Sequence, residues 1–427
     1  MAKIRTLSAV ALVGAFALTG CASASGDAGG SKELTYWSMW KEGEAQQKVV
    51  ADAIADFEEE TGIEVNVQWQ GRDNIKKTVP TLNTNKVPDL VDGSFAKLAP
   101  VLAETGQAKP LVEAYGAEVE GDAVSSLIPE AYLAGDVVTV EGEDAPWMLP
   151  YSLTSDAIWF NAAEHPDLVA NPPQDWASFL SVMDEMKAAG TTPIAIDGDV
   201  AGYNAYWYTS AMVGLAGPGS LREMAADETG EAWDAPEALE AAQMIEGLVE
   251  GGYFIDGYNA SKWPAQQQAW SDNQAALMFN GTWIPTETGP YAAEGFEYSS
   301  FPFPALGSSA RADFVGFAVP ARAKNSDNAQ DLAAFFLKKQ YQDALGTDAK
   351  IIPIRPDAAV SDEMSTVTDV LAAADSYYQQ NDGISFPGYS EKLFWPAVSD
   401  LVLGKIDAEA FVETMKTGQV DYWKLNS

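Results

Sequence analysis

Residues 33–69 read ELTYWSMWKEGEAQQKVVADAIADFEEETGIEVNVQW, and this stretch indicates the fold class of the whole chain. ELTYWSMW (33–40) predicts a β-strand. Residues 45–60 predict a helix that ends at Gly62, because apolar side chains recur at helical spacing, at Val49, Val50, Ala53, Ile54 and Phe57. In 63–69 apolar and polar residues alternate, as in a strand with one buried face. The order strand, helix, strand predicts an α/β fold, in which helices pack on a sheet.

The rest of the chain continues this mixture of strands and helices. A short apolar strand is expected to end in a turn at Asp92–Gly93, and 145–161 predict two aromatic-rich strands broken at Pro150. Asp175 is expected to cap a helix, and 191–197 (TTPIAID) predict a further strand. With 427 residues, 47% of them hydrophobic, and no internal repeat, the chain can form one large or two medium domains.

The N-terminus has the pattern of a secretion signal. Lys3 and Arg5 precede an apolar run of 12 residues, 7–18, and a helix of that length covers only about 18 Å of a roughly 30 Å hydrocarbon core. The following letters, LTGC, resemble the bacterial lipobox, in which the chain is cut before a cysteine that then carries a diacylglycerol. We expect 1–20 to be a lipoprotein signal peptide and Cys21 to be lipidated. The alternative is a soluble secreted protein without a lipid.

Residues 21–31 are expected to form a flexible tether. From Ala22 to Ser31 no apolar side chain is larger than alanine, and such a segment spans roughly 18 Å root-mean-square. Cys21 is the only cysteine, so no intrachain disulfide is expected. No later segment is long and apolar enough to span a bilayer. These features predict a protein held by a lipid at the extracellular face of the cell membrane.

The charge balance excludes several classes of function. The formal net charge is −37, so loss of the signal peptide with its two cations leaves −39, and nucleic acid and polyanionic ligands are not expected as partners. His165 is the only histidine and precedes a proline, which gives little support to metal or Ser–His catalysis. No cofactor and no metal are implied.

Eight segments, in order, resemble a known family, the extracellular solute-binding proteins of carbohydrate ABC transporters, of the maltodextrin-binding type (solute-binding family 1). The segments are FEEETGIEVNV (57–67), KVPDLV (86–91), LPYSLTSDAIWFN (149–161), NPPQDW (171–176), AWSDNQAALMFNGTW (269–283), FVGFAVPARAKNSDNAQDLAAFFL (314–337), IIPIRPD (351–357) and FWPAVSDLVLGKIDAEAF (394–411).

The resemblance implies a periplasmic-binding-protein-like fold, two α/β lobes joined by a hinge with a ligand cleft between them. Lobe one would comprise 31–150 plus 301–338, and lobe two 151–300 plus 339–427. The Pro-flanked stretches LPYS and FPFP would lie at two of the crossings. At Gly93, Ser94 and Ala96 the chain lacks the Trp and charged residues that maltose binders keep, which argues against maltodextrin itself.

Aromatic residues beside turns are the first candidates for a sugar site, because rings stack on the C–H patches of a sugar while polar groups reach its hydroxyls. Trp283, in FNGTW, and Trp395, in LFWPAV, fall on stacking positions of the family. A core Trp after a turn is the alternative for Trp283. Trp40 follows the first predicted strand and is accompanied by Glu42 and Glu44, at a strand end where ligands commonly lie.

Further candidates come from the aromatic stretch DVAGYNAYWYTS and from the expected crossings. The spacing in DVAGYNAYWYTS does not allow all its rings to face one way, so some must be core. The resemblance implies ligand contacts at Tyr203, Asn204, Trp207, Tyr151, Thr154 and Asp313.

The sequence thus predicts a non-enzymatic, monomeric, lipid-anchored receptor that captures a neutral or weakly polar oligosaccharide and delivers it to ABC transporter permease subunits. Two alternatives stay open. One is an anchored glycoside hydrolase, which needs a carboxylate pair that 62 acidic residues would supply by chance. The other is a binder of a peptide or polyol on the same fold. An adhesion lipoprotein is disfavoured by the lack of modular linkers.

Overall fold

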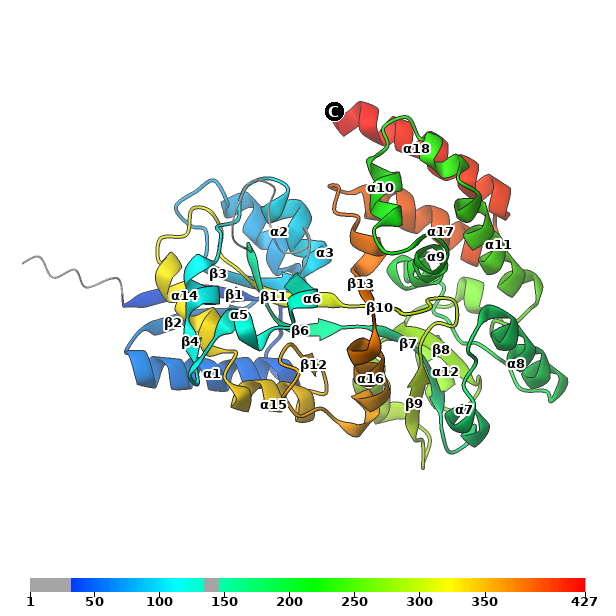
Figure 1. Cartoon of the computed structure of the whole chain (residues 1–427), viewed down its shortest axis with the longest axis horizontal. Coiled ribbons are helices and arrows are strands. Elements are labelled where there is room, and N and C mark those ends of the chain that lie inside the picture. Colours follow the sequence, from blue (N-terminus) through cyan, green and yellow to red (C-terminus); the bar gives the residue numbers. More distant parts are fainter. Residues whose placement is uncertain (1–31, 134–145, 427) are drawn as a thin grey trace, which may run out of the picture.

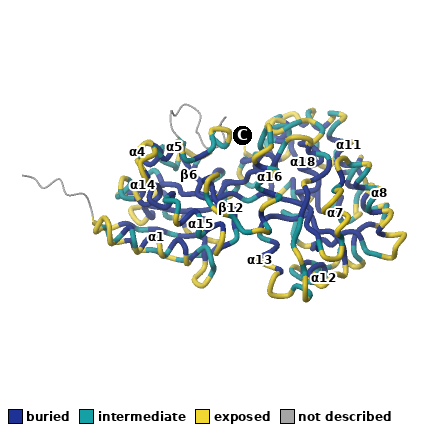
Figure 2. Tube along the Cα trace, turned by 60° about the horizontal axis from the view of Figure 1, so that its bottom comes forward, coloured by how far each residue is buried: buried dark blue, intermediate teal, exposed yellow. Residues whose placement is uncertain are grey.

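The structure is a computed structural model that describes residues 32–133 and 146–426. Two lobes lie side by side, joined by strands that run from one to the other (Figure 1). Buried residues run through the interior of both lobes, whereas exposed residues gather on outer helices and loops (Figure 2). The α/β fold expected from the sequence is confirmed.

Lobe one is built on a six-stranded sheet of order β12-β6-β11-β3-β1-β2. β1 is parallel to β2 and β3, and β11 is antiparallel to β3 and β6. The strands are β1 (Glu33–Ser38), β2 (Glu64–Trp69), β3 (Leu90–Ser94), β6 (Met148–Thr154), β11 (Asp313–Ala318) and β12 (Ile352–Pro353). Around them lie α1 (Ala45–Thr61), α2 (Asn74–Thr78), α3 (Phe95–Leu98), α4 (Val112–Gly116), β4 (Glu118–Val119), β5 (Asp122–Ala123), α5 (Val124–Leu127), α6 (Glu130–Leu133), α14 (Ser326–Phe335) and α15 (Lys339–Thr347).

The β1-α1-β2 unit forms as its pattern predicts. The five apolar positions of α1, Val49, Val50, Ala53, Ile54 and Phe57, are all buried. Gly62 ends the helix in a left-handed conformation with φ of 70°, and its N–H bonds to the carbonyl of Glu58. A residue with a Cβ would be strained at that φ, which is why glycine suits this position.

Lobe two is built on a three-stranded antiparallel sheet of order β8-β7-β9, with α9 at the centre of a helical layer on one face. The strands are β7 (Asp156–Asn161), β8 (Leu277–Gly281) and β9 (Tyr298–Phe301). The helices are α7 (Pro166–Ala170), α8 (Trp176–Ala188), α9 (Ala201–Ala216), α10 (Ser220–Ala226), α11 (Pro236–Glu250), α12 (Ala265–Ser271), α13 (Ile284–Thr288), α17 (Trp395–Val402) and α18 (Ala408–Asn426). Asp175 caps α8 by accepting a bond from the Ser178 N–H, as expected.

The chain passes between the lobes three times. It crosses first at Ser155, between β6 and β7, and a second time at Ala312, between β10 (Ser309–Arg311) and β11. The third passage follows α16 (Ser365–Ala373), which packs against β9, and uses β13 (Ser376–Tyr378), which is paired in parallel with β10. Neither lobe is therefore continuous in sequence.

Three local predictions were wrong. Asp92 and Gly93 do not form a turn but continue β3, where both pair with β11. Pro150 lies inside β6 instead of breaking it, at a register shift in the pairing with β11, where its missing N–H removes one bond of the ladder. Residues 191–197 form no strand and contribute only isolated bridges at Ile194.

The lobe boundaries expected from the sequence differ from the structure at all three crossings. Tyr151 to Thr154 belong to β6 and so to lobe one, and 302–311 precede the second crossing and stay with lobe two. The largest difference concerns the residues after 338. α15 packs on α1, and β12 pairs with β6, so this stretch belongs to lobe one.

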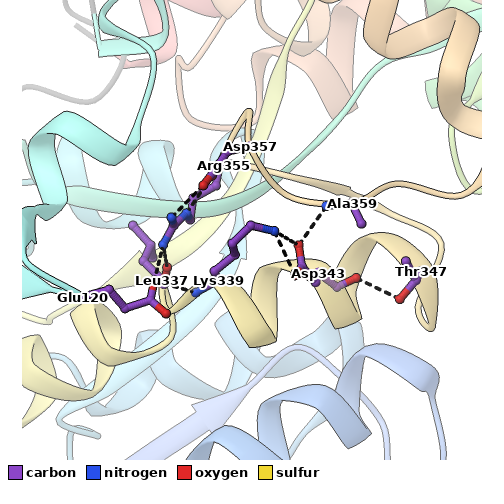
Figure 3. A network of polar contacts seen from close by, with 8 residues as sticks. All are labelled: Glu120, Leu337, Lys339, Asp343, Thr347, Arg355, Asp357 and Ala359. Carbon is purple, nitrogen blue, oxygen red and sulfur yellow. Dashed lines mark hydrogen bonds and ion pairs between the residues drawn. The ribbon is translucent and has the colours of Figure 1, made fainter.

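A polar network fastens that stretch to lobe one (Figure 3). The buried Arg355 guanidinium donates to the Leu337 carbonyl at 3.0 Å, to Glu120 at 2.7 Å and to Asp357 at 2.9 Å. The Glu120 carboxylate also accepts from the Lys339 N–H at 3.0 Å, so it caps the start of α15. These contacts join residues far apart in sequence, which the local pattern cannot reveal.

Within the described part of the chain, no helix has both the length and the apolarity needed to cross a membrane.

Candidate functional site

A cavity of about 500 Å³ lies between the lobes, and we call it the main cavity. Both lobes and the crossing strands contribute to its walls, so a ligand here would touch the two lobes at once. Lobe one supplies Met39, Trp40, Glu44, Arg72, Ser94 and Lys97; the crossings supply Thr154, Arg311, Asp313 and Gln380; and lobe two supplies Tyr203, Tyr206, Thr282, Trp283, Thr286 and Glu287.

The lobe-one wall lies at the carboxyl ends of parallel strands. Ser94 ends β3, and Met39 and Trp40 follow β1, its parallel neighbour. In open α/β sheets ligands bind outside such strand ends, because the loops that follow there provide side chains around a shared crevice.

Trp40 is held in this wall by a relay of hydrogen bonds. Its Nε1 donates to the Tyr151 hydroxyl at 2.9 Å, and that hydroxyl donates to Asp92 Oδ2 at 2.9 Å. The Arg72 guanidinium lies 4.5 Å from the Trp40 ring centroid and pairs with Glu44 at 2.9 Å. The ring is 6% exposed, so it presents a limited, well-fixed surface to the cavity.

Asp92 anchors this relay from beneath the cavity. Its Oδ1 accepts a 2.7 Å bond from the Met39 N–H, which fixes the backbone just before Trp40. Burial raises the pKa of Asp92 to about 6, and the hydrogen bonds from Met39 and Tyr151 offset only part of that rise. The carboxyl therefore changes its protonation state near mildly acidic pH.

The lobe-two wall is a group of stacked aromatic rings. Trp283 stacks on Tyr203 with ring centroids 5.6 Å apart and an interplanar angle of 30°, and lies 6.4 Å from Tyr206. Gly281 makes room for it, because a Cβ there would lie 2.2 Å from the Trp283 ring. Trp283 is half-buried, so part of its ring faces the cavity.

The floor of the main cavity is a buried ionic cluster at the crossings. Arg311 Nη1 lies 3.4 Å from Asp156 and its Nη2 lies 3.5 Å from Asp313, with the Tyr206 ring 4.3 Å from the guanidinium carbon. Burial raises the pKa of both carboxyls, while the Arg311 charge opposes that rise. Burial alone would lower the pKa of Arg311, but Tyr206 and the two carboxylates raise it overall, so Arg311 stays charged.

A second cavity of about 670 Å³, the side cavity, adjoins the main one. Arg72, Ser94, Lys97 and Gln380 line both cavities, and Trp395 lines the side cavity alone. The two spaces therefore share one wall and form a longer cleft.

Trp395 is fixed by a strained segment of backbone. Its Nε1 donates to Asn381 Oδ1 at 2.9 Å, and both Asn381 and Asp382 have φ of 54°. The buried Asp382 accepts bonds from the N–H groups of Gly219 and Leu221 at 2.7 and 2.9 Å, which stabilises this conformation. Burial raises the pKa of Asp382 to about 6.

Side chains from both lobes also meet near the side cavity, in a contact that we call the interlobe latch. Glu104, which follows α3 in lobe one, accepts a 2.6 Å bond from the Ser385 hydroxyl of lobe two. Arg222 of α10 lies 3.7 Å from Glu104 and donates to Ser385 at 2.6 Å. The latch ties the lobes together independently of the crossing strands.

Most of the residues singled out from the sequence line the cleft. Trp283, Trp40, Glu44, Tyr203, Thr154 and Asp313 line the main cavity, and Trp395 lines the side cavity.

The other four predicted contacts lie elsewhere. Tyr151 is fully buried behind Trp40. Asn204 is also buried, and its amide donates to the Gly198 carbonyl at 3.1 Å. Trp207 is 1% exposed and packs in the lobe-two core, and Glu42 is exposed outside both cavities. Cys21 lies outside the described residues.

Sequence reasoning missed several residues of the cleft. Tyr206 could have been found, because it lies three positions after Tyr203 on one face of α9. Arg311 precedes Asp313 by two positions but carries no pattern of its own. Arg72 lies in the short turn before α2, and Glu287 lies in α13. The sequence around each of them resembles any charged surface.

Among residues 32–133 and 146–426, no group of His, Cys, Asp and Glu side chains is arranged to hold a metal ion.

A family model described as bacterial extracellular solute-binding protein matches residues 52–374. An uncharacterised ABC transporter extracellular-binding protein of Pyrococcus horikoshii is 23% identical over 299 residues, which are 68% of this chain and 67% of that protein. The diacetylchitobiose binding protein NgcE of Streptomyces coelicolor is 22% identical over 267 residues, 59% of this chain and 55% of NgcE, so the chain spans about half the length of this relative.

A solved structure of RafE of Streptococcus pneumoniae in complex with raffinose has the same fold. The TM-score is 0.70 at 16% identity, and the superposition covers 91% of this chain and 99% of that one.

Proposed function

The chain belongs to the bacterial extracellular solute-binding proteins, and from this premise we propose that it captures an oligosaccharide between its lobes for an ABC importer. The observation that carries the proposal is the main cavity, where the stacked Trp283 and Tyr203 face polar groups of the other lobe. Rings of this kind suit the C–H faces of sugars, and Arg72, Glu44 and Asp313 suit hydroxyl groups. The diacetylchitobiose and raffinose binding of similar proteins supports the same ligand class.

Capture proceeds by closure of the lobes about the three crossings. A ligand that contacts both walls has more contacts in the closed state than in the open one, and this difference in affinity drives the closure. The closed monomer then delivers the sugar to permease subunits. We further propose that Cys21 carries the lipid that holds the protein at the extracellular membrane face.

The protein acts as a binder and not as a hydrolase. Asp313, which lines the cavity, and Asp156, which lies behind Arg311, are both counter-ions of Arg311. This arrangement suits a structural role better than proton transfer to a glycosidic bond. A glycan that binds should be recovered intact after incubation with the pure protein. Product formation that one Asp or Glu substitution abolishes would establish the hydrolase alternative.

The proposed function is tested by screening the purified protein against mono- and oligosaccharides for a rise in thermal unfolding midpoint. A sugar that binds only the folded state stabilises it by RT ln(1 + [L]/Kd), which is about 2.7 kcal/mol at a hundredfold excess over Kd. Small-angle scattering with the best sugar should show a smaller radius of gyration. If a peptide or polyol stabilises the protein and no sugar does, the ligand class is wrong.

A further inference from the structure

The side cavity gathers positive charge in a strongly acidic chain. The whole chain has 62 Asp and Glu against 25 Lys and Arg, but the walls of this cavity reverse the balance. The charged residues that line it are Arg72, Lys76, Lys97, Lys392, Asp73 and Glu391.

Three of the cations that line the side cavity, Arg72, Lys76 and Lys97, belong to lobe one. Arg72 and Lys76 are each paired with a carboxylate, whereas Lys97 is not. Lys76 pairs with Asp73 at 2.9 Å, and Arg72 pairs with Glu44 at the same distance. Among the described residues Lys97 takes part in no ion pair, and its Nζ has a 3.4 Å bond to the Arg72 carbonyl. The Lys97 side chain is exposed toward the cleft but lies partly beneath its neighbours. This partial burial, followed by the charges of Arg72 and Lys76, lowers the pKa of Lys97 despite the attraction of Asp73 and Glu391. A bound anion would relieve this repulsion.

Lys97 also lies where the two cavities meet. It lines both of them, with Trp283 in the main cavity and Trp395 in the side cavity. The Trp395 ring is half-buried and held by Asn381, so it offers a fixed surface for a second sugar ring. A chain of sugars that occupied both cavities would cross the wall that they share, and Lys97 belongs to that wall.

We propose that the cleft selects an oligosaccharide that carries a carboxylate, as a uronic acid does, and that Lys97 is the residue that recognises this group in the side cavity. The inference rests on the proposed function and specifies its ligand. The net charge of the whole chain favours a neutral sugar, but salt screens distant charges beyond about 8 Å at physiological ionic strength, so the nearest side chains decide.

The test compares acidic oligosaccharides with their own carboxyl-reduced forms, which differ only at the charged group. The probes are oligogalacturonides of three and four units and glucuronic-acid-bearing xylo-oligosaccharides. Calorimetry with the full chain should show at least tenfold tighter binding of an acidic member at low salt, with the advantage falling as NaCl is added. Lys97→Gln should remove the advantage, and Lys97→Arg should keep it. Lys86→Gln, an equal charge change at an exposed lysine outside both cavities, should have no effect.

The outcomes separate this inference from the proposed function. If a reduced form, or any other neutral sugar, binds as tightly as every acidic probe, or if Lys97→Gln keeps the preference, Lys97 does not select a carboxylate, although the protein remains a sugar receptor. If no sugar of either kind binds, the proposed function fails and this inference fails with it.

Discussion

Trp283 and Trp207 belong to the same lobe, yet one ring borders the cleft and the other is enclosed by the core. Trp207 is 1% exposed and packs edge-on against Phe254, Phe279 and Phe303. Trp283 is half-buried, with part of its ring facing the main cavity. This contrast makes the two residues a matched pair for separating a binding role from a structural one.

We predict that Trp283→Ala weakens binding of the best sugar by about 2 kcal/mol or more, as for a buried aromatic anchor, with a smaller loss of stability. Trp207→Ala should instead leave a cavity that costs about 3–5 kcal/mol of unfolding free energy. Denaturant unfolding without ligand and calorimetry with ligand measure the two quantities. The prediction fails if Trp283→Ala loses several kcal/mol of stability while its folded fraction binds normally.

Asp92 leads to a prediction about pH. Burial raises its pKa from the ordinary value of 3.8 to about 6, so between these values the folded state holds a proton that the unfolded state releases. Stability from this residue is therefore fully present below pH 4 and is lost as pH rises past 6, by about 3 kcal/mol at 1.36 kcal/mol per pKa unit.

Asp92→Asn stays neutral at every pH and should lack this loss. The difference in unfolding free energy between Asp92→Asn and the unmodified protein should shift in favour of the variant by about 2 kcal/mol from pH 4 to pH 7, because part of the loss has already occurred at pH 4. Denaturant unfolding at several pH values measures the shift. Asp382 has the same pKa direction, but it is present in both proteins and cancels in the difference. A constant difference across this range would contradict the prediction.

At the scale of strands and helices, the first two crossings are tied together by one buried cation. Arg311 ends β10 and pairs with Asp156, which begins β7, and with Asp313, which begins β11.

Arg311→Met should cost about 3–5 kcal/mol of unfolding free energy, because it leaves two buried carboxylates without a counter-ion. Adding Asp156→Asn and Asp313→Asn should restore much of that loss. If the triple variant is as unstable as Arg311→Met, packing of the guanidinium matters more than its charge.

Sequence pattern predicted the elements whose information is local. The periodicity of 45–60 and the glycine after it were sufficient for α1, and Asp175 was sufficient for the start of α8. The motif order also predicted the family, which the match over 52–374 confirms. β12 was misplaced because its partner, β6, lies about two hundred positions earlier, and no local pattern encodes that pairing.

Part of the site was predictable, because aromatic residues fall on positions where the resembling family binds its ligand. Trp283 was found from its place at a stacking position of the family, and the structure places its ring over Gly281, at the end of β8. Tyr151 was assigned to the cleft, but strand alternation turns it beneath Trp40 toward Asp92. Lys97 could not be found, because its role depends on which other charges lie near it, and a sequence does not give that neighbourhood.

At the scale of the molecule, the interlobe latch should shift the balance between open and closed forms. Glu104 and Arg222 are partly exposed, so the latch stabilises closure by at most about 1 kcal/mol. Glu104→Ala should enlarge the radius of gyration of the sugar-free protein and weaken sugar binding by up to about fivefold. Glu59→Ala, an exposed acid on α1, is the control. Unchanged scattering and affinity in Glu104→Ala would show that the latch does not favour closure.

The threefold crossing of the chain has a consequence for the time at which the protein can fold. β11 lies between β6 and β3 in the middle of the lobe-one sheet, so β6 cannot join the β3-β1-β2 part of that sheet until residue 318 has been synthesised. At roughly 5–20 residues per second, this delay after β6 is on the order of 10 s. A nascent chain that remains unfolded for so long is suited to export through a membrane channel.

We predict that a fragment ending at residue 300 lacks protected amides in β1 and β3 by hydrogen exchange, whereas one ending at 358 protects them. Equal protection in both fragments would show that lobe one folds without its central strand.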